Sequence, residues 1–347
     1  MKANPLYVLG PCAAESREQV METAKQIADY RSLVIGDWSL VIGDWSLDGA
    51  PFIFRAGVWK PRSRPDTFQG AGEEGLKWLQ EVKATFGVPV ATEVATPEHV
   101  QAALAAGMDY LWIGARTSAN PIAVEKISES IRNNPIHPKG LLIKNPVNAD
   151  AELWLGNIER LEKTGVPVIA VHRGCNHQPC WSMAHKVRTA RPDIPMLLDP
   201  SHMSGDAKQV PALLEKVAEL GLDGAMVEVH THPEFALSDR KQQIRPDEIG
   251  HWSLVNGHLK DTELNWFRAE IDELDEQLWS TIAARMDVSR RIGEWKKAHG
   301  VAPLQPERYQ QIIERIQKTD RYADRIQTDF AIRLYDLIHE ESLKQQK

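Results

Sequence analysis

Eight short apolar segments recur through the first 230 residues, and stretches with apolar residues at helical spacing lie between them. The segments are LYVLGPC (6–12), FIFRAG (52–57), VPVATEV (88–94), YLWIGA (110–115), LLIKNP (141–146), VPVIAVHRG (166–174), PMLLDPSH (195–202) and GAMVEVH (224–230). They are continuous rather than alternating in polarity, which is typical of strands buried on both faces. Eight such strand–helix units predict a (β/α)₈ barrel, and a doubly wound open sheet is the alternative.

Length and composition limit the class of protein further. A chain of 347 residues suits one large domain plus a smaller one, and 42% hydrophobic with 26% charged residues is ordinary for a globular protein. A net charge of -7 argues against a general nucleic-acid binder. No apolar run approaches the ~20 residues of a membrane span, and the N-terminus lacks the apolar region of a signal peptide. Three cysteines cannot all pair with one another, so we expect a cytoplasmic protein.

The ends of the eight segments carry polar side chains that would meet at one end of a barrel. These residues are Cys12, Arg55, Glu93, Arg116, Lys144, Arg173, His202 and Glu228. Active sites of (β/α)₈ barrels lie at this C-terminal end of the strands. Strands often end in polar residues as they reach water, but seven of these eight, all except Glu93, divide into two kinds. Arg55, Arg116, Lys144 and Arg173 form a cationic group suited to phosphate and carboxylate.

The remaining kind consists of side chains that bind metals. Cys12, His202 and Glu228 are joined by Asp239, eleven residues after Glu228 in the segment VEVHTHPEFALSD. A mixed sulfur, nitrogen and oxygen set suits one divalent transition metal ion, which could be manganese, iron, cobalt or zinc. His230 and His232 are weaker candidates for the same role.

The sequence changes character after residue 255. The polar segment GHLKDTELNW predicts a linker, which we place at 255–264, between a barrel domain (1–254) and an all-helical domain (265–347). One long amphipathic helix is expected from about Asn265 to His299, a second from Pro306, and a third from about Asp324 to Lys344. A plain dimerisation bundle is the simplest interpretation. Arg285 and Lys296, eleven residues apart, nevertheless indicate a second cationic site on one helix face.

Two features fit this scheme less well. The heptapeptide SLVIGDW occurs in tandem at 32–38 and 39–45, where one copy is compatible with a strand and the other with an extended loop. The segment HRGCNHQPC places His172, Cys175, His177 and Cys180 close together. Its spacing matches no common structural zinc pattern, so we favour thiols in a loop over a zinc site.

The motifs GPCAAES, FRAGVWKPRSRP, WIGART, LIKNP, HRG, DPSH and VEVH…ALSD together resemble 3-deoxy-D-arabino-heptulosonate 7-phosphate (DAHP) synthase of the shorter microbial type, over about residues 5–250. The residues after 265, including RAEIDELDEQLW, PERYQQIIERI and LIHEES, are similar to an all-helical chorismate mutase. The resemblance implies a bifunctional enzyme of aromatic amino acid biosynthesis, with a metal-dependent condensation and a rearrangement of chorismate to prephenate.

The resemblance also implies residue roles in the barrel. The metal ligands fall on Cys12, His202, Glu228 and Asp239, the set chosen above on chemistry. The phosphoenolpyruvate site falls on Arg55, Lys60, Arg116, Lys144 and Arg173, with Lys60 as the candidate catalytic acid. The erythrose 4-phosphate site falls on Lys60, Pro61, Arg62 and Ser63, where serine replaces the usual threonine.

In the helical part the resemblance gives a chorismate site of Arg268, Arg285, Lys296, Arg308, Tyr309, Ser342 and Gln346, with Lys296 as the catalytic donor. Two positions depart from the family pattern: Gln305 replaces an acidic residue, and Tyr309 replaces a glutamate that accepts the substrate hydroxyl. Tyrosine can still accept that hydrogen bond.

Three other functions are compatible with parts of the sequence. The barrel could condense phosphoenolpyruvate with arabinose 5-phosphate, although KPRS argues against it, since those relatives resemble KANRS at this point. The helical part could sense chorismate or prephenate without turnover. A zinc hydrolase built on 172–180 is the weakest alternative.

Helix geometry adds an expectation about assembly. Arg268 and Arg285 are seventeen residues apart, which is about 4.7 turns, so one straight helix cannot direct Arg268 and Arg285 to one small substrate. Similar mutases pair long helices from two chains. We therefore expect a homodimer through the helical domain, with Arg268 serving the partner's site, and the alternative is a monomeric bundle with Arg268 in solvent.

Overall fold

The computed structural model describes residues 5–34, 41–42, 45–46, 52–60, 66–251, 262–319 and 324–346. The chain divides into two compact units, Met1–Glu270 and Ile271–Lys347. Among the described residues, no helix is long and apolar enough to cross a membrane.

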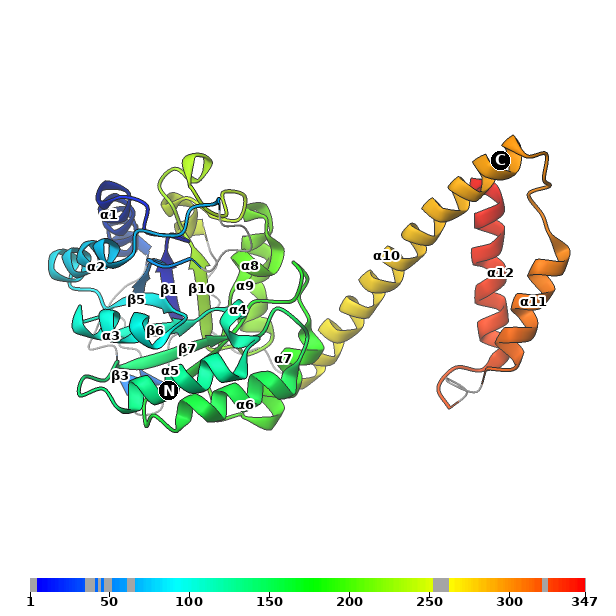
Figure 1. The fold of residues 1–347 in the computed structure, drawn as a ribbon. Helices are drawn as coiled ribbons and strands as arrows, with labels where there is room; N and C mark the ends of the chain where they lie inside the picture. The colour runs from blue at the N-terminus through cyan, green and yellow to red at the C-terminus, as the bar shows by residue number, and fades with distance from the viewer. Residues whose placement is uncertain are drawn as a thin grey trace. The chain divides into compact units, whose positions relative to one another are not determined.

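The first unit is a closed barrel of parallel strands, in the order β1-β10-β9-β8-β7-β6-β5-β4. Its strands are β1 Leu6–Gly10, β4 Ile53–Arg55, β5 Val90–Val94, β6 Tyr110–Ile113, β7 Gly140–Lys144, β8 Val168–His172, β9 Met196–Leu198 and β10 Gly224–Glu228. Each lies within one of the eight apolar segments or starts one residue before it, so the barrel prediction is confirmed and the open sheet is excluded. In Figure 1 the strands run through the middle of this unit and the helices lie around them.

Closure of the barrel brings the strand ends level with one another. β1 pairs with β10 so that Gly10 lies opposite Glu228, and β7 pairs with β8 so that Lys144 lies opposite Val171. Since all strands are parallel, the polar residues that follow them gather at one end.

The helices of this unit follow the strands along the chain. They are α1 Arg17–Val34, α2 Glu73–Phe86, α3 Pro97–Ala105, α4 Ala115–Ser118, α5 Pro121–Arg132, α6 Ala151–Glu162, α7 Trp181–Ala190, α8 Pro200–Ser204 and α9 Val210–Glu219, with short 3₁₀ turns η1 Ala207–Gln209, η2 Pro233–Phe235 and η3 Pro246–His251. Several begin at a side chain that accepts a backbone N–H: Thr96, Asn120, Asp150 and Asp199 cap α3, α5, α6 and α8.

Two layers of apolar side chains explain why the strand segments are apolar throughout. One set of alternate residues fills the barrel interior and includes Val8, Trp112, Leu142 and Met226. The neighbouring residues in each strand, such as Leu9 and Ile143, face the surrounding helices. A strand between two apolar layers has no solvent-facing side, so it shows no polar alternation.

The tandem SLVIGDW segment takes two conformations where it is described. Residues 32–34 of the first copy end α1, so the expected extended loop is wrong at these residues. The second copy supplies β2 Val41–Ile42 and the first residue of β3 Trp45–Ser46, which pair antiparallel in a separate two-stranded sheet. The remaining residues of the two copies lie outside the described part.

Three helices without strands follow the barrel: α10 Thr262–Ala298, α11 Pro306–Gln317 and α12 Thr328–Gln345. The expected helical region is thereby confirmed. The first residues of α10 belong to the barrel unit, where the Trp266 ring stacks on His185 of α7 at 5.2 Å and meets Trp181 edge-on. Asn265 adds a hydrogen bond to the backbone oxygen of Glu219, at the end of α9. The expected linker at 255–264 lies outside the described residues up to 261, and Thr262–Leu264 are helical.

Candidate functional site

Three of the four predicted metal ligands gather at the C-terminal end of the barrel. Cys12 follows β1, Glu228 ends β10, and Asp239 lies in the loop beyond it. Their ligand atoms all lie within 4.8 Å of one another. Asp239 has a φ of 48°, a left-handed conformation that is uncommon outside glycine but that aspartate adopts more often than most residues.

The Cys12 thiol lies at the centre of this group. Its Sγ donates to Oδ2 of Asp239 at 3.0 Å and accepts from Nζ of Lys60 at 3.2 Å. Burial raises the pKa of the thiol and the negative charge of Glu228 adds to the rise, while Lys60 opposes it. Thiolate and carboxylate ligands bind a divalent ion in their deprotonated forms, so an ion here would replace the proton between Cys12 and Asp239. The residues therefore fit a metal.

His202, the fourth predicted ligand, is held in a fixed orientation by Asp199. Its Nδ1 lies 2.9 Å from Oδ2 of Asp199, and its Nε2 lies 3.6 Å from Oε1 of Glu228. A histidine that ligates a metal is commonly held in this way by a carboxylate on its other nitrogen. Asp199 is fully buried, and although burial opposes its charge, His202 and Lys144 hold its pKa well below the usual value.

The predicted cations enter the same buried cluster. Nη2 of Arg55 donates to Oε1 of Glu228 at 3.1 Å, and the guanidinium lies 4.8 Å from the centre of the Trp112 ring. Nζ of Lys144 donates to Oδ2 of Asp199 at 2.7 Å. Buried charges need such partners, since an unpaired charge in the interior costs several kcal/mol.

Lys60 is placed by a close approach of the backbone. A Cβ at Gly57 would lie 2.8 Å from Nζ of Lys60, so glycine at this position leaves room for the ammonium group beside Cys12. Burial disfavours the charged form of Lys60, but the electrostatic effects of Cys12, Glu93 and Glu228 outweigh it and raise the pKa. Lys60 is thus a buried cation that can give up a proton to a stronger base.

The other predicted anion-binding residues differ in their placement. Arg173 is buried, and its Nη2 donates to the backbone oxygen of His202 at 3.4 Å. Arg116 is exposed on α4, and among the described residues it makes no hydrogen bond with the cluster. Pro61, Arg62 and Ser63 lie outside the described residues.

Sequence reasoning missed the residues that hold the ligands in place. Nε2 of Gln242 donates to Oε2 of Glu228 at 2.8 Å, and the Cys12 backbone N–H donates to Oε1 of Gln243 at 2.9 Å. Ser201 accepts from the backbone N–H of Glu228 at 3.0 Å. Asp199 and Ser201 belong to the DPSH motif, and Gln242 lies three residues after Asp239. Their closeness in sequence to the predicted ligands His202 and Asp239 is the signal that could have identified them.

The weaker metal candidates lie apart from this group. Nδ1 of His230 accepts from the backbone N–H of His232, and its Nε2 lies 3.8 Å from Glu15, while the His232 side chain is exposed. Cys175 and Gln178 exchange backbone hydrogen bonds around a tight turn in which Asn176 and His177 have positive φ. Among the described residues, which include 172–180, these histidines and cysteines form no metal-type group, and no disulfide is formed.

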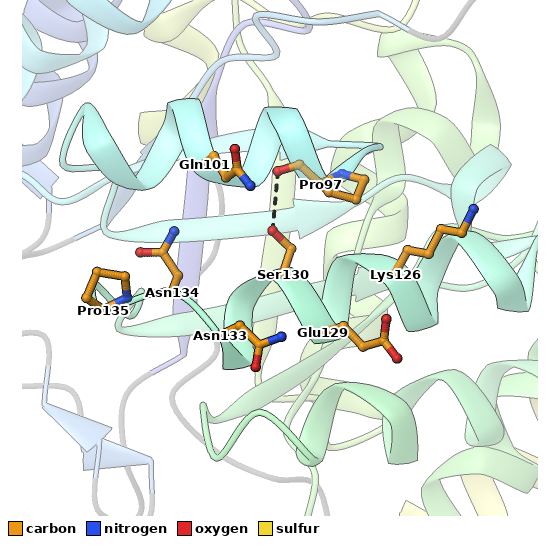
Figure 2. Close-up of a pocket in the computed structure, with 8 residues that line it drawn as sticks. All are labelled: Pro97, Gln101, Lys126, Glu129, Ser130, Asn133, Asn134 and Pro135. Atoms are coloured by element: carbon orange, nitrogen blue, oxygen red, sulfur yellow. Dashed lines mark hydrogen bonds between the residues drawn. The ribbon is translucent and has the colours of Figure 1, made fainter.

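A groove of about 500 Å³ lies on the outer side of the barrel, between α3 and α5. Figure 2 shows Ser130 reaching across it to the backbone oxygen of Pro97, with the side chains of Gln101, Lys126 and Glu129 around it. None of the predicted site residues lines this groove.

The helical unit gathers a second polar cluster. Nη1 of Arg285 donates to Oγ of Ser342, and Nζ of Lys296 donates to Oε1 of Gln346 at 3.0 Å and to the backbone oxygen of Pro303. Lys296 is 8% exposed, an unusual burial for lysine on a three-helix unit. A Cβ at Gly293 would lie 2.6 Å from Cα of Gln346, so glycine permits the close approach of α10 and α12.

The remaining predicted residues of the helical site lie on α11 and at the start of α10. The Tyr309 hydroxyl donates to Oδ1 of Asp336, and the exposed Arg308 bonds Gln311 at 3.3 Å. Arg268 belongs to the barrel unit, where its Nη1 donates to Oδ1 of Asn265 at 3.3 Å.

Fold and site together define a (β/α)₈ barrel with a metal-type, cation-lined mouth, joined to a helical region with a cationic cluster. A sequence model of the DAHP synthetase I family matches residues 2–263, and one of chorismate mutase type II matches residues 267–347. The chain belongs to the DAHP synthetase I family.

Individual relatives agree with this assignment. Over 244 residues, 68% of this chain, it is 30% identical to phospho-2-dehydro-3-deoxyheptonate aldolase of Thermotoga maritima, and the match spans 64% of that relative. It is 28% identical to 2-dehydro-3-deoxyphosphooctonate aldolase of Helicobacter pylori, covering 74% of this chain and 95% of the relative. A crystal structure of DAHP synthase from Thermotoga maritima matches with a TM-score of 0.57 and 26% identity, covering 80% of this chain and 70% of the other.

Proposed function

We propose that the chain is bifunctional. Residues 1–254 would condense phosphoenolpyruvate with erythrose 4-phosphate, residues 255–264 would link the domains, and residues 265–347 would rearrange chorismate to prephenate. The observation that carries the first part is the group of buried Cys12, buried Glu228 and exposed Asp239, with Nζ of Lys60 3.2 Å from the thiol sulfur. A cation beside a metal-type site is what the joining of two phosphorylated anions requires.

In the condensation, this chain's residues bind and orient both substrates. Arg116, Lys144 and Arg173 hold the phosphate of phosphoenolpyruvate, and Arg55 with Lys60 hold its carboxylate. Arg62 and Ser63 hold the phosphate of the sugar. Carbon 3 of phosphoenolpyruvate attacks the aldehyde, Lys60 donates a proton to the new alkoxide, water adds at carbon 2, and phosphate leaves.

Cys12, His202, Glu228 and Asp239 would hold one divalent ion, which supplies Lewis acidity toward the aldehyde when bound. Asp199 keeps His202 turned toward the site, and Gln242 does the same for Glu228. The chemistry of the donor set suits manganese, iron, cobalt or zinc.

The choice of aldehyde needs a direct test, because relatives that make octulosonate also match the chain. The purified protein should release phosphate from phosphoenolpyruvate with erythrose 4-phosphate and not with arabinose 5-phosphate. A clear preference for the pentose would contradict the proposed substrate.

For the helical unit we propose catalysis rather than sensing alone. Arg285, Lys296 and Arg308 would bind the carboxylates and ether oxygen of chorismate, with Ser342 and Gln346 orienting the cations. The rearrangement is intramolecular, so holding the substrate in a compact conformation and stabilising charge on the ether oxygen suffices. Loss of chorismate absorbance with the full-length protein distinguishes turnover from mere binding.

We further propose that this unit forms a homodimer, with Arg268 serving the partner's site. The support is an apolar side of α10 that single-chain packing leaves exposed: Ile271, Leu274, Leu278 and Ile292 are 43–61% exposed. Such a stripe on a soluble helix favours an interface with another helix. The three cysteines without a disulfide support a reducing, cytoplasmic location.

A further inference from the structure

One face of α12 carries polar residues toward the cations of α10. Asp336, His339, Ser342 and Gln346 follow one another at intervals of three or four residues, which places them along one side of the helix. Ser342 and Gln346 accept from Arg285 and Lys296. Asp336 and His339 continue this row toward α11, where Tyr309 lies.

The second half of the row meets Tyr309 of α11. The Tyr309 hydroxyl donates to Oδ1 of Asp336, and the His339 ring lies 5.0 Å from the Tyr309 ring and 5.9 Å from that of Tyr335. Tyr335 in turn lies under the guanidinium of Arg285, 5.9 Å from its ring centre. The two tyrosines and the histidine thus connect Asp336 to the cationic cluster.

The Tyr309 hydroxyl is available to accept a hydrogen bond. A phenolic hydroxyl has one proton to donate and lone pairs that accept. Its proton is committed to Asp336, so its oxygen is left as an acceptor. In the cationic cluster, Ser342 and Gln346 already accept from Arg285 and Lys296. Chorismate carries a hydroxyl as well as two carboxylates, and the cations cannot accept from that hydroxyl.

We propose that Asp336 is a positioning residue of the mutase site: it orients the Tyr309 hydroxyl as the acceptor for the hydroxyl of chorismate, and the His339 ring packs against Tyr309 to keep this arrangement. The inference rests on the mutase activity proposed above. Burial lowers the pKa of His339, and the charges of Arg285 and Lys296 lower it further despite Asp336. The ring therefore stays neutral at neutral pH and does not compete with Tyr309 for Asp336.

The test is a double-mutant cycle on the full-length protein, with chorismate turnover measured for Tyr309→Phe, Asp336→Ala and both together. Each single change should lower kcat/KM up to about tenfold, the upper end for one hydrogen bond between neutral groups. The pair should cost about the same as either one, since both changes abolish the oriented acceptor at Tyr309. Glu340→Gln, an exposed change on the same helix, should have no effect.

A second background separates positioning from structural support. Tyr309→Glu supplies a carboxylate acceptor directly, so adding Asp336→Ala there should cost nothing. Equal losses from Asp336→Ala in both backgrounds, or single effects that multiply to about a hundredfold, would overturn the proposal. Chorismate turnover by the wild-type protein tests the mutase activity itself. If the wild-type protein does not turn chorismate over, the proposed function is contradicted, not the role of Asp336. Far-UV circular dichroism of each variant checks that the helices persist.

Discussion

The barrel mouth and the helical cluster hold their cations in opposite ways. At the mouth, Arg55 and Lys144 lie against the buried carboxylates of Glu228 and Asp199. In the helical unit, Arg285 and Lys296 bond the neutral side chains of Ser342 and Gln346. A carboxylate network needs a counter-ion of its own and suits a metal, whereas cations with neutral partners keep their charge for a dianionic substrate.

The two regions differ in completeness as well. Closure of the barrel brings ligands from β1, β10 and the following loop together within one chain. The helical unit instead leaves an apolar side of α10 exposed, and Arg268 lies in the other unit. This difference supports the proposal of a self-contained, metal-dependent site in the barrel and a metal-free site in the helical unit that needs a second chain.

The largest expected effect comes from Cys12→Ala. The variant should lose condensation activity by more than about 10³-fold, because the ligand set loses its sulfur and the neighbouring carboxylates lose their central partner. Mutase activity of the same preparation should be unchanged and serves as the control for folding. A Cys12→Ala protein supplied with metal that retains near-normal condensation would remove Cys12 from the site.

Lys296→Met should produce the reverse pattern. The methionine keeps much of the apolar stem but removes the donor to the ether oxygen, which we expect to cost ~10²–10³ in the rate of chorismate loss. Condensation should stay at the wild-type rate. Arg290→Met, a change of an exposed cation on the same helix, is the matched control and should leave both activities intact.

The need for a second chain can be tested by mixing two inactive variants. Arg268→Ala and Arg308→Ala chains, unfolded and refolded together in equal amounts, should recover about a quarter of wild-type mutase activity, because half the dimers are mixed and each has one intact site. Each variant refolded alone gives the baseline. No recovery in a sample whose subunits demonstrably mix would show that Arg268 acts within its own chain or not at all.

The smallest expected effect concerns stability at the end of β8. Burial lowers the pKa of His172 to about 3, so the folded protein excludes a proton that the unfolded chain binds near its ordinary value. This histidine therefore lowers stability as pH falls from about 6.5 toward 3, at about 1.4 kcal/mol per pH unit.

His172→Phe should flatten that slope, since phenylalanine can pack between Trp154 and Trp181 without titrating. Urea unfolding of the barrel at pH 7 and pH 5 measures how the free energy of unfolding depends on pH. His137→Phe, a change of an exposed histidine, is the control. An identical pH slope in the wild type and His172→Phe would mean that His172 is protonated in the folded state.

The sequence predicted the barrel and the three helices well because their signals are local. Continuous apolar runs such as LLIKNP, repeated eight times between helical stretches, are typical of strands between two layers, and Pro306 marks the first turn of α11. The ligand set was also readable, because strand ends converge once the fold is known.

The supporting residues were not predictable in the same way. Asp199 and Gln243 gain their roles from neighbours 55 and 231 residues away, Lys144 and Cys12, which only the closed barrel brings into contact. Asp336 and His339 resemble ordinary polar residues of an amphipathic helix until α11 is packed against α12. The exposed position of Arg116 likewise depends on how α4 leaves the barrel.

The central claim is that one chain carries a metal-dependent site and a metal-free site. It is tested most directly by measuring condensation and chorismate turnover on one full-length preparation, with and without a chelator. We predict that the chelator abolishes condensation, that added divalent metal restores it, and that chorismate turnover is unchanged throughout. Loss of both activities with the fold intact, or condensation that persists in the demonstrably metal-free protein, would contradict the account.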